Sequence, residues 1–118
     1  MMPERCDRTE KLIGSESLRR LRASSVIIFG LGGVGGYVLE ALVRVGVGEL
    51  WLVDFDSISE SNCNRQLLAL TETVGRPKVE VAAERVRSIN PDVVVHTVMQ
   101  FVDDASIASL LSEAEPSY

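Results

Sequence analysis

The sequence has few of the residues that mark metal-bound or exported proteins. It contains two cysteines, Cys6 and Cys63, which lie far apart and form no C-x-x-C pair, and a single histidine, His96. Two unpaired cysteines are typical of proteins in the reducing cytosol. Two distant cysteines and one histidine also do not have the spacing of metal ligands. No apolar run is long enough to cross a bilayer, and the charged N-terminus lacks the apolar segment of a secretory signal. We therefore expect a cytoplasmic protein with no membrane partner and no metal ligand among these residues.

Positive charge is also scarce, since the net charge of the 118 residues is −5. This argues against a protein that grips nucleic acid over its whole surface. The charge is uneven, because residues 1–25 carry six Lys and Arg against four acids. We interpret these cations as a solvated helix face, with a local basic surface as the alternative. The length and the 46% hydrophobic content suit one domain with a core.

The apolar residues follow a pattern in which strands alternate with helices. Continuous apolar runs predict strands buried on both faces at 25–30, 49–56 and 92–99. Helical spacing of apolar residues predicts helices at 15–25, 36–48, 76–91 and 103–115. This order predicts an α/β fold with a Rossmann-like parallel sheet, flanking helices and right-handed crossovers.

The predicted elements divide the chain into two parts. We expect residues 1–24 to form an N-terminal arm and a helix, with Cys6 as a tail residue. Residues 25–118 are expected to form a Rossmann-like nucleotide-binding domain, incomplete because it stops after its third strand–helix unit. Residues 57–73 form a long polar loop with a helical turn.

The segment "FGLGGVGG" matches the dinucleotide fingerprint G-x-G-x-x-G between a predicted strand and a predicted helix. Glycines let backbone N–H groups approach a phosphate, and the helix N-terminus adds a positive dipole end. Asp54 ends the second strand, where a carboxylate can accept hydrogen bonds from ribose or cap the next turn. Both NAD and ATP fit these residues. The loop glycines are Gly30, Gly32, Gly33 and Gly35.

Two downstream cations favour ATP over NAD. Arg65 follows Asn62 and Asn64 in the long loop, and Lys78 falls in the first turn of the next helix. Fixed cations around a phosphate suit phosphoryl or nucleotidyl transfer, because negative charge builds there in the transition state. From their spacing alone, the better interpretation of both is a solvated surface cation.

The motifs "GLGGVGG", "DFDSISESNCNRQ" and "VGRPKVE", in this order, resemble the adenylating family that contains the ThiF, MoeB and HesA proteins and the ubiquitin-activating enzymes. The resemblance implies that the protein joins a carboxylate to AMP and releases pyrophosphate. It implies that the four glycines form the ATP loop, that Asp54 holds the ribose, and that Asn62, Arg65 and Lys78 contact the triphosphate. Gln66 would support the loop, and Cys63 is interpreted as a small filler.

The same resemblance carries expectations about partners. Arg8 looks like an arginine finger that enters the site of a partner subunit, which implies a homodimer. Segments such as "RTEKLIG" and "NRQLLAL" are most similar to members that act on threonylcarbamoyladenosine in tRNA, where adenylation precedes ring closure. An aspartate that holds Mg²⁺ in the family is expected beyond Tyr118, so this fragment alone is expected to be inactive.

Two other functions stay open. Adenylation of the C-terminus of a ubiquitin-like sulfur carrier would make a sulfur-transfer protein the partner instead of tRNA. An NAD-binding oxidoreductase module is weaker, because it leaves Arg8, Arg65 and Lys78 without a role.

Overall fold

Three parallel strands form the centre of the computed structural model, which describes residues 2–118. They are β1 (Ser25–Phe29), β2 (Glu49–Val53) and β3 (Val94–Val98), and they lie in the order β1-β2-β3. The register sets Val26 opposite Leu50 and Leu50 opposite Val95. The predicted Rossmann-like parallel sheet is confirmed. The second strand ends earlier than predicted, so the acids from Asp54 onward lie in the loop at the carboxyl edge.

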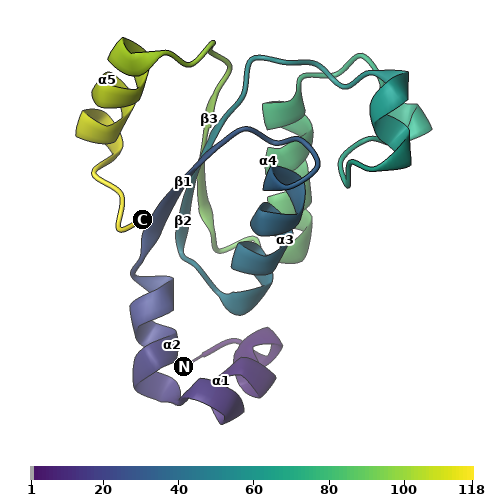
Figure 1. The fold of residues 1–118 in the computed structure, drawn as a ribbon. Helices are drawn as coiled ribbons and strands as arrows, with labels where there is room; N and C mark the ends of the chain where they lie inside the picture. The colour runs from purple at the N-terminus through teal and green to yellow at the C-terminus, as the bar shows by residue number, and fades with distance from the viewer. Residues whose placement is uncertain (1) are drawn as a thin grey trace.

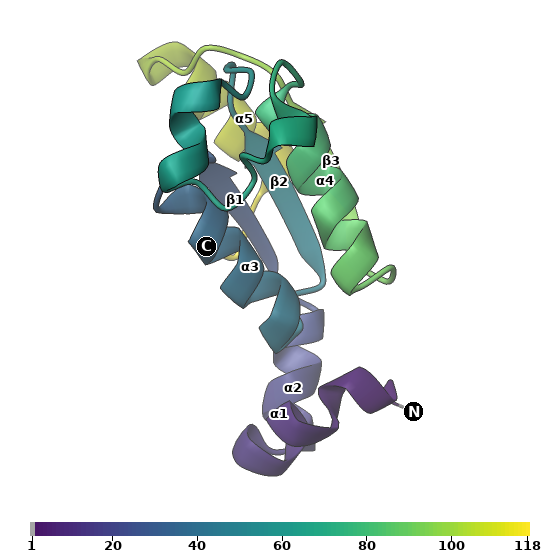
Figure 2. The same ribbon diagram turned by 90° about the vertical axis from the view of Figure 1, so that its right-hand side faces the viewer.

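Helices cover both faces of this sheet (Figures 1 and 2). α3 (Gly35–Val45) and α4 (Lys78–Ile89) cover one face, and α5 (Asp104–Ala114) lies on the other. The side chains between the strands, α3 and α4 are aliphatic and almost fully buried, which gives the chain one continuous core. They include Val26, Ile28, Leu39, Val43, Leu50, Leu52, Val79, Ala82 and Val86.

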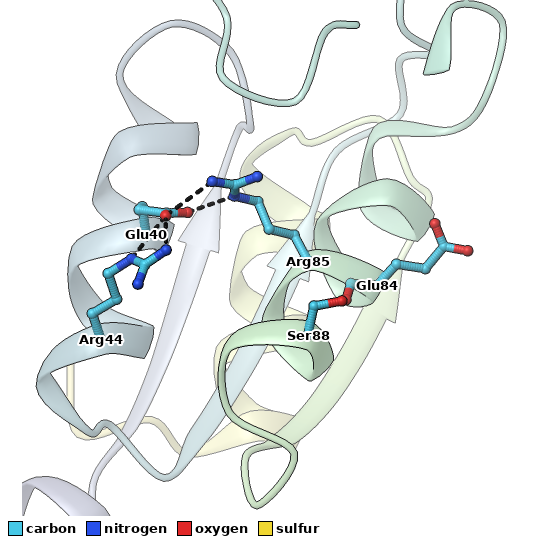
Figure 3. A network of polar contacts seen from close by, with 5 residues as sticks. All are labelled: Glu40, Arg44, Glu84, Arg85 and Ser88. Carbon is cyan, nitrogen blue, oxygen red and sulfur yellow. Dashed lines mark hydrogen bonds and ion pairs between the residues drawn. The ribbon is translucent and has the colours of Figure 1, made fainter. Parts of the chain in front are cut away.

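An ion-pair network joins α3 to α4 on the outside of this core (Figure 3). Glu40 Oε2 accepts from Arg85 Nε at 2.6 Å, and Glu40 Oε1 accepts from Arg85 Nη2 at 3.0 Å. Arg44, one turn along α3, donates to the same carboxylate at 2.9 Å. The hydrogen bonds from Arg85, followed by those from Arg44, lower the pKa of Glu40. The network therefore fixes the helix that follows the glycine loop against the helix that begins at Lys78.

The N-terminal part is more ordered than the sequence predicts. It forms a short turn, η1 (Glu4–Cys6), and two helices, α1 (Asp7–Ile13) and α2 (Ser15–Arg22). Gly14 joins α1 to α2 with a φ of 88°, and no side chain in the described part of the chain caps α2. Cys6 is 5% exposed and lies 3.8 Å from Arg22 Nη1, so the interpretation of Cys6 as a tail residue is wrong. Met1 of the predicted arm lies outside the described residues.

The β1 edge of the sheet is only partly paired. The N–H groups of Ser117 and Tyr118 donate to the Ser25 carbonyl at 2.7 and 3.2 Å, and the Ile27 N–H donates to the Tyr118 carbonyl at 3.0 Å. An apolar cleft of about 450 Å³ runs beside this edge, with Val38 on its wall. Val38 is 41% exposed, although its spacing predicts a core position. Among residues 2–118, no helix combines the length and hydrophobicity needed to span a membrane.

Candidate functional site

The glycine loop turns the chain sharply from β1 into α3. Gly30 follows the strand with a φ of 93°, and its N–H donates to the Val53 carbonyl at 2.8 Å. A Cβ on Gly35 would overlap the Gly30 carbonyl, so the helix can begin this close to the strand only because Gly35 has no side chain. The loop therefore sits at the carboxyl edge of the sheet.

The backbone of this loop presents unsatisfied donors. Within the described chain, the N–H groups of residues 32–35 have no hydrogen-bond acceptor. They precede or begin α3, an 11-residue helix whose dipole places partial positive charge at this end. Four free donors at a helix N-terminus can hold an anion such as a phosphate.

Asp54 lies directly across from the loop and is 9% exposed. Its Oδ2 accepts from the Leu31 N–H at 2.7 Å, and its Oδ1 accepts from the Asp56 N–H at 2.8 Å. The sequence allows two roles for Asp54, and the observed hydrogen bonds correspond to the one in which its carboxylate caps the next turn. Contact with a ribose stays a prediction.

The segment after β2 forms a closed loop with its ends held together. Ser57 and Pro77 form an antiparallel bridge, and the Ile58 N–H donates to the Arg76 carbonyl at 2.9 Å. Two 3₁₀ turns, η2 (Glu60–Asn64) and η3 (Thr71–Thr73), lie within it, in place of the single helical turn predicted. The buried side chains that anchor this loop to the core are Ile58, Leu68 and Ala69.

This closed loop packs on the glycine loop. Gln66 Nε2 lies 3.7 Å from the position that a Cβ of Gly32 would take, and Leu67 Cβ lies 3.7 Å from the equivalent position at Gly36. The structure thus brings two motifs, far apart in the sequence, to one end of the sheet. Gln66 is 9% exposed and supports this contact, as the resemblance implies for the loop.

Asn62 and Arg65 hold the turn of this loop. Asn62 is 9% exposed, and its Oδ1 accepts from the Ser59 N–H at 2.9 Å. Arg65 is exposed, and its Nη1 donates to the Ser61 carbonyl at 3.1 Å and to Asn64 Oδ1 at 3.0 Å. All these partners of Arg65 are neutral, so its charge is not compensated within 4.0 Å among residues 2–118.

Lys78 is the first residue of α4, and its N–H donates to the Asp56 carbonyl at 3.0 Å. Its side chain is largely buried, since the residue is 6% exposed. In the part of the chain that the structure describes, no carboxylate lies within 4.0 Å of its ammonium group. The Lys78 ammonium keeps contact with solvent, so this uncompensated cation is available to an anion supplied from outside.

Arg8 is not brought together with these residues. It lies in α1, which sits beyond the amino ends of the strands, whereas the glycine loop lies at their carboxyl ends (Figures 1 and 2). Arg8 is exposed. Within one chain, the candidate finger and the glycine loop are therefore at opposite ends of the sheet.

A cavity of about 350 Å³ opens at the carboxyl edge beside Gly30 and Asp54. Phe55 and Phe101 form part of its wall, with ring centroids 5.2 Å apart and an interplanar angle of 75°. Neither residue was predicted as part of the site. Each follows the carboxyl end of a strand, where parallel sheets bind ligands, and this placement was the available signal. The two residues are 50% and 66% exposed and offer an apolar surface to a flat ring.

A parallel sheet with a glycine loop at its carboxyl edge places the chain in the Rossmann-like class of α/β proteins. Within that class, the chain belongs to the ThiF family, whose model matches residues 6–116.

The chain is similar to several known members of this family. A tRNA threonylcarbamoyladenosine dehydratase of Haemophilus influenzae is 43% identical over 102 residues, which cover 86% of this chain and 39% of the relative. A molybdopterin-synthase adenylyltransferase of Escherichia coli is 45% identical over 93 residues, 79% of this chain and 37% of the relative. The structure of the E. coli dehydratase TcdA in complex with ATP matches with a TM-score of 0.90 and 39% identity, over 92% of this chain and 45% of that chain. This chain thus spans less than half the length of these relatives.

Proposed function

We propose that the protein binds ATP and uses it to adenylate a carboxylate. The observation that carries this proposal is Lys78, a cation without an anionic partner in the described chain, which begins α4 at the same edge of the sheet as a loop with four free N–H donors. A triphosphate would satisfy both. The 350 Å³ cavity with Phe55 and Phe101 would take the adenine base, and Asp54 would accept from the ribose. The complex of TcdA with ATP supports the same assignment.

The residues suggest how the chain would promote the reaction. A carboxylate oxygen attacks the α-phosphorus, and the bond to pyrophosphate breaks. Negative charge on the phosphate oxygens would be met by Lys78, the loop N–H groups and Asn62. Arg65 would exchange its neutral partners Ser61 and Asn64 for a phosphate oxygen, a stronger hydrogen bond because both groups are charged.

We expect Mg²⁺ to accompany ATP, but these residues do not fit a resident metal site. Among residues 2–118, no group of three or more His, Cys, Asp or Glu side chains could hold a metal ion. We therefore assign no step to a metal held by them.

We further propose that the carboxylate belongs to threonylcarbamoyladenosine in tRNA, in a cytoplasmic homodimer. The support is the similarity to the dehydratase of H. influenzae and to TcdA. The alternative substrate is the C-terminus of a sulfur-carrier protein, supported by the 45% identity to the molybdopterin-synthase adenylyltransferase. The homodimer is supported by the place of Arg8, which only a second subunit could bring to a glycine loop.

Calorimetry of the full-length protein with ATP and with NAD tests the nucleotide. We expect binding of ATP with Mg²⁺ and none of NAD, and the reverse result would overturn the proposal. Pyrophosphate release tests the substrate, because tRNA that carries threonylcarbamoyladenosine should stimulate it and a ubiquitin-like sulfur carrier should not. Stimulation by the sulfur carrier alone would favour the alternative.

A further inference from the structure

The carboxylate of Asp54 is shared between two loops. One oxygen holds the Leu31 N–H of the glycine loop, and the other holds the Asp56 N–H of the loop after β2. The two loops follow adjacent parallel strands, so Asp54 ties their carboxyl ends together across the sheet. At 2.7 and 2.8 Å, and with Asp54 9% exposed, these are short bonds to a charged acceptor, the stronger class of hydrogen bond.

Leu31 is the residue of the glycine loop that the Asp54 carboxylate contacts. Its side chain is fully buried in the core, and its N–H is bound by Asp54. The residue before it, Gly30, is bonded to Val53. The first two loop residues are thereby fixed, while the next four N–H groups, at residues 32–35, are left without acceptors in the described chain. The placement of those four donors depends on where Leu31 is held.

We propose that Asp54 is a positioning residue, which sets the glycine loop in its binding conformation before any nucleotide arrives. A carboxylate offers about four lone-pair sites, and the two loops use two of them. The remaining sites can accept from ribose hydroxyls without releasing either loop. The consequence, which rests on the proposed function, is that the N–H groups of the glycine loop meet the phosphates of ATP without reorganisation.

Amide hydrogen exchange of the nucleotide-free, full-length protein tests the positioning directly. Asp54→Asn keeps the shape but turns an NH₂ donor toward one of the two N–H groups. Asp56→Asn is the matched control, because its exposed carboxylate accepts no hydrogen bond among residues 2–118. We expect exchange at Leu31 to speed up about 10- to 100-fold in Asp54→Asn, as for the loss of one charged hydrogen bond, and to stay unchanged in the control. Unchanged exchange at Leu31 would overturn the proposal, and Asp54→Ser repeats the test if Asp54→Asn does not fold.

The affinities for ATP and for 2′,3′-dideoxy-ATP distinguish a positioning role of Asp54 from a contact with the ribose. If Asp54 acted only on the ribose, its loss would weaken ATP binding and leave 2′,3′-dideoxy-ATP binding unchanged. Positioning predicts that Asp54→Asn weakens both by about 10-fold or more. An unchanged affinity for dideoxy-ATP would overturn the proposal. If the wild-type protein binds neither nucleotide, the proposed function fails, and the exchange experiment alone decides whether Asp54 sets the loop.

Discussion

Two glycines of the same loop differ in the space around them. A Cβ on Gly35 would overlap the Gly30 carbonyl, whereas a Cβ on Gly33 would meet nothing within 4 Å among residues 2–118. The φ of Gly33 is also not positive, so alanine can adopt its conformation. Packing therefore requires glycine at position 35, the last glycine of the fingerprint G-x-G-x-x-G. The fold does not require glycine at position 33, which is a variable position of the fingerprint.

This contrast gives a paired prediction for the full-length protein. Gly35→Ala should lower stability by about 1–3 kcal/mol, because the clash is with rigid backbone. Gly33→Ala should change stability by less than about 0.5 kcal/mol, or raise it slightly through the entropy of the unfolded chain. Melting temperatures of the two variants measure the difference. Equal melting temperatures would mean that the helix start can shift away from the strand.

Substitution of Lys78 should change activity far more than stability. Lys78→Met keeps the apolar stem and removes a solvent-accessible charge without an ionic partner among residues 2–118, so the stability of the ligand-free protein should change by less than about 0.5 kcal/mol. Turnover should fall about 100-fold or more, as for one preorganised charge-stabilising group, with a smaller loss of ATP affinity. Arg87→Ala, an exposed cation on the same helix, is the control and should change neither. An unaltered rate of pyrophosphate release from Lys78→Met would remove Lys78 from the proposed site.

At the scale of single residues, the sequence predicts the features that depend on residue type and on the order of neighbouring residues. The glycine loop, Asp54 and Lys78 stand out because few other residue types could serve at those points of a strand–turn–helix pattern. Phe55 and Phe101 do not stand out, because the residue type alone does not distinguish an apolar residue after a strand from a core residue. The bond from Leu31 to Asp54 is equally hidden, since it depends on the distance between two loops 23 residues apart.

At the scale of elements, the Glu40 network is the cross-link between α3 and α4. Arg85 reaches Glu40 with two nitrogens from the other helix, whereas Arg44 reaches it from the same helix. The side chain of Glu40 is 17% exposed and that of Arg44 is 60% exposed. The bond between helices therefore carries more of the structural restraint than the bond within α3.

This geometry sets a pH-dependent prediction. The pKa of Glu40 is lowered in the folded protein, so its stabilisation is complete above its ordinary value of 4.5 and is lost as the pH falls through the lower folded-state pKa. At pH 7, Glu40→Gln and Arg85→Gln should each cost about 1 kcal/mol, and Arg44→Gln less. Melting temperatures at pH 7 and at pH 4 and below should show the gap between wild type and Glu40→Gln closing toward acid. A gap that widens toward acid would contradict the assignment.

The elements themselves were largely predictable, because strand and helix periods differ and glycine and proline mark the boundaries. The N-terminal helix α1 was not predictable. None of its residues is buried, so it carries no apolar stripe that could have indicated it. The closed loop from Ser57 to Pro77 was seen only as a polar segment, since its closure depends on hydrogen bonds between its two ends.

At the scale of the whole molecule, the distance of Arg8 from the glycine loop predicts complementation between subunits. Arg8→Ala and Lys78→Ala subunits of the full-length protein should each be inactive alone. If Arg8 acts in a partner's site, mixed dimers contain one site of wild-type composition, and activity should return to about a quarter of wild type, since half of randomly mixed dimers carry one intact site of two. No recovery despite demonstrated subunit exchange would mean that Arg8 does not act across subunits.

The bonds from Ser117 and Tyr118 to β1 have a consequence for the order in which the molecule forms. The Ser25 and Ser117 pair joins residues 92 positions apart, the kind of contact that is made late, because a long loop must first close. The sheet and its two covering helices, by contrast, come from consecutive segments. α5 buries only Ser106 and Leu110, so we expect α5 and residues 117–118 to open at a lower free energy than the sheet. We therefore expect hydrogen exchange to protect the strands beside the glycine loop more strongly than α5 and the β1 edge.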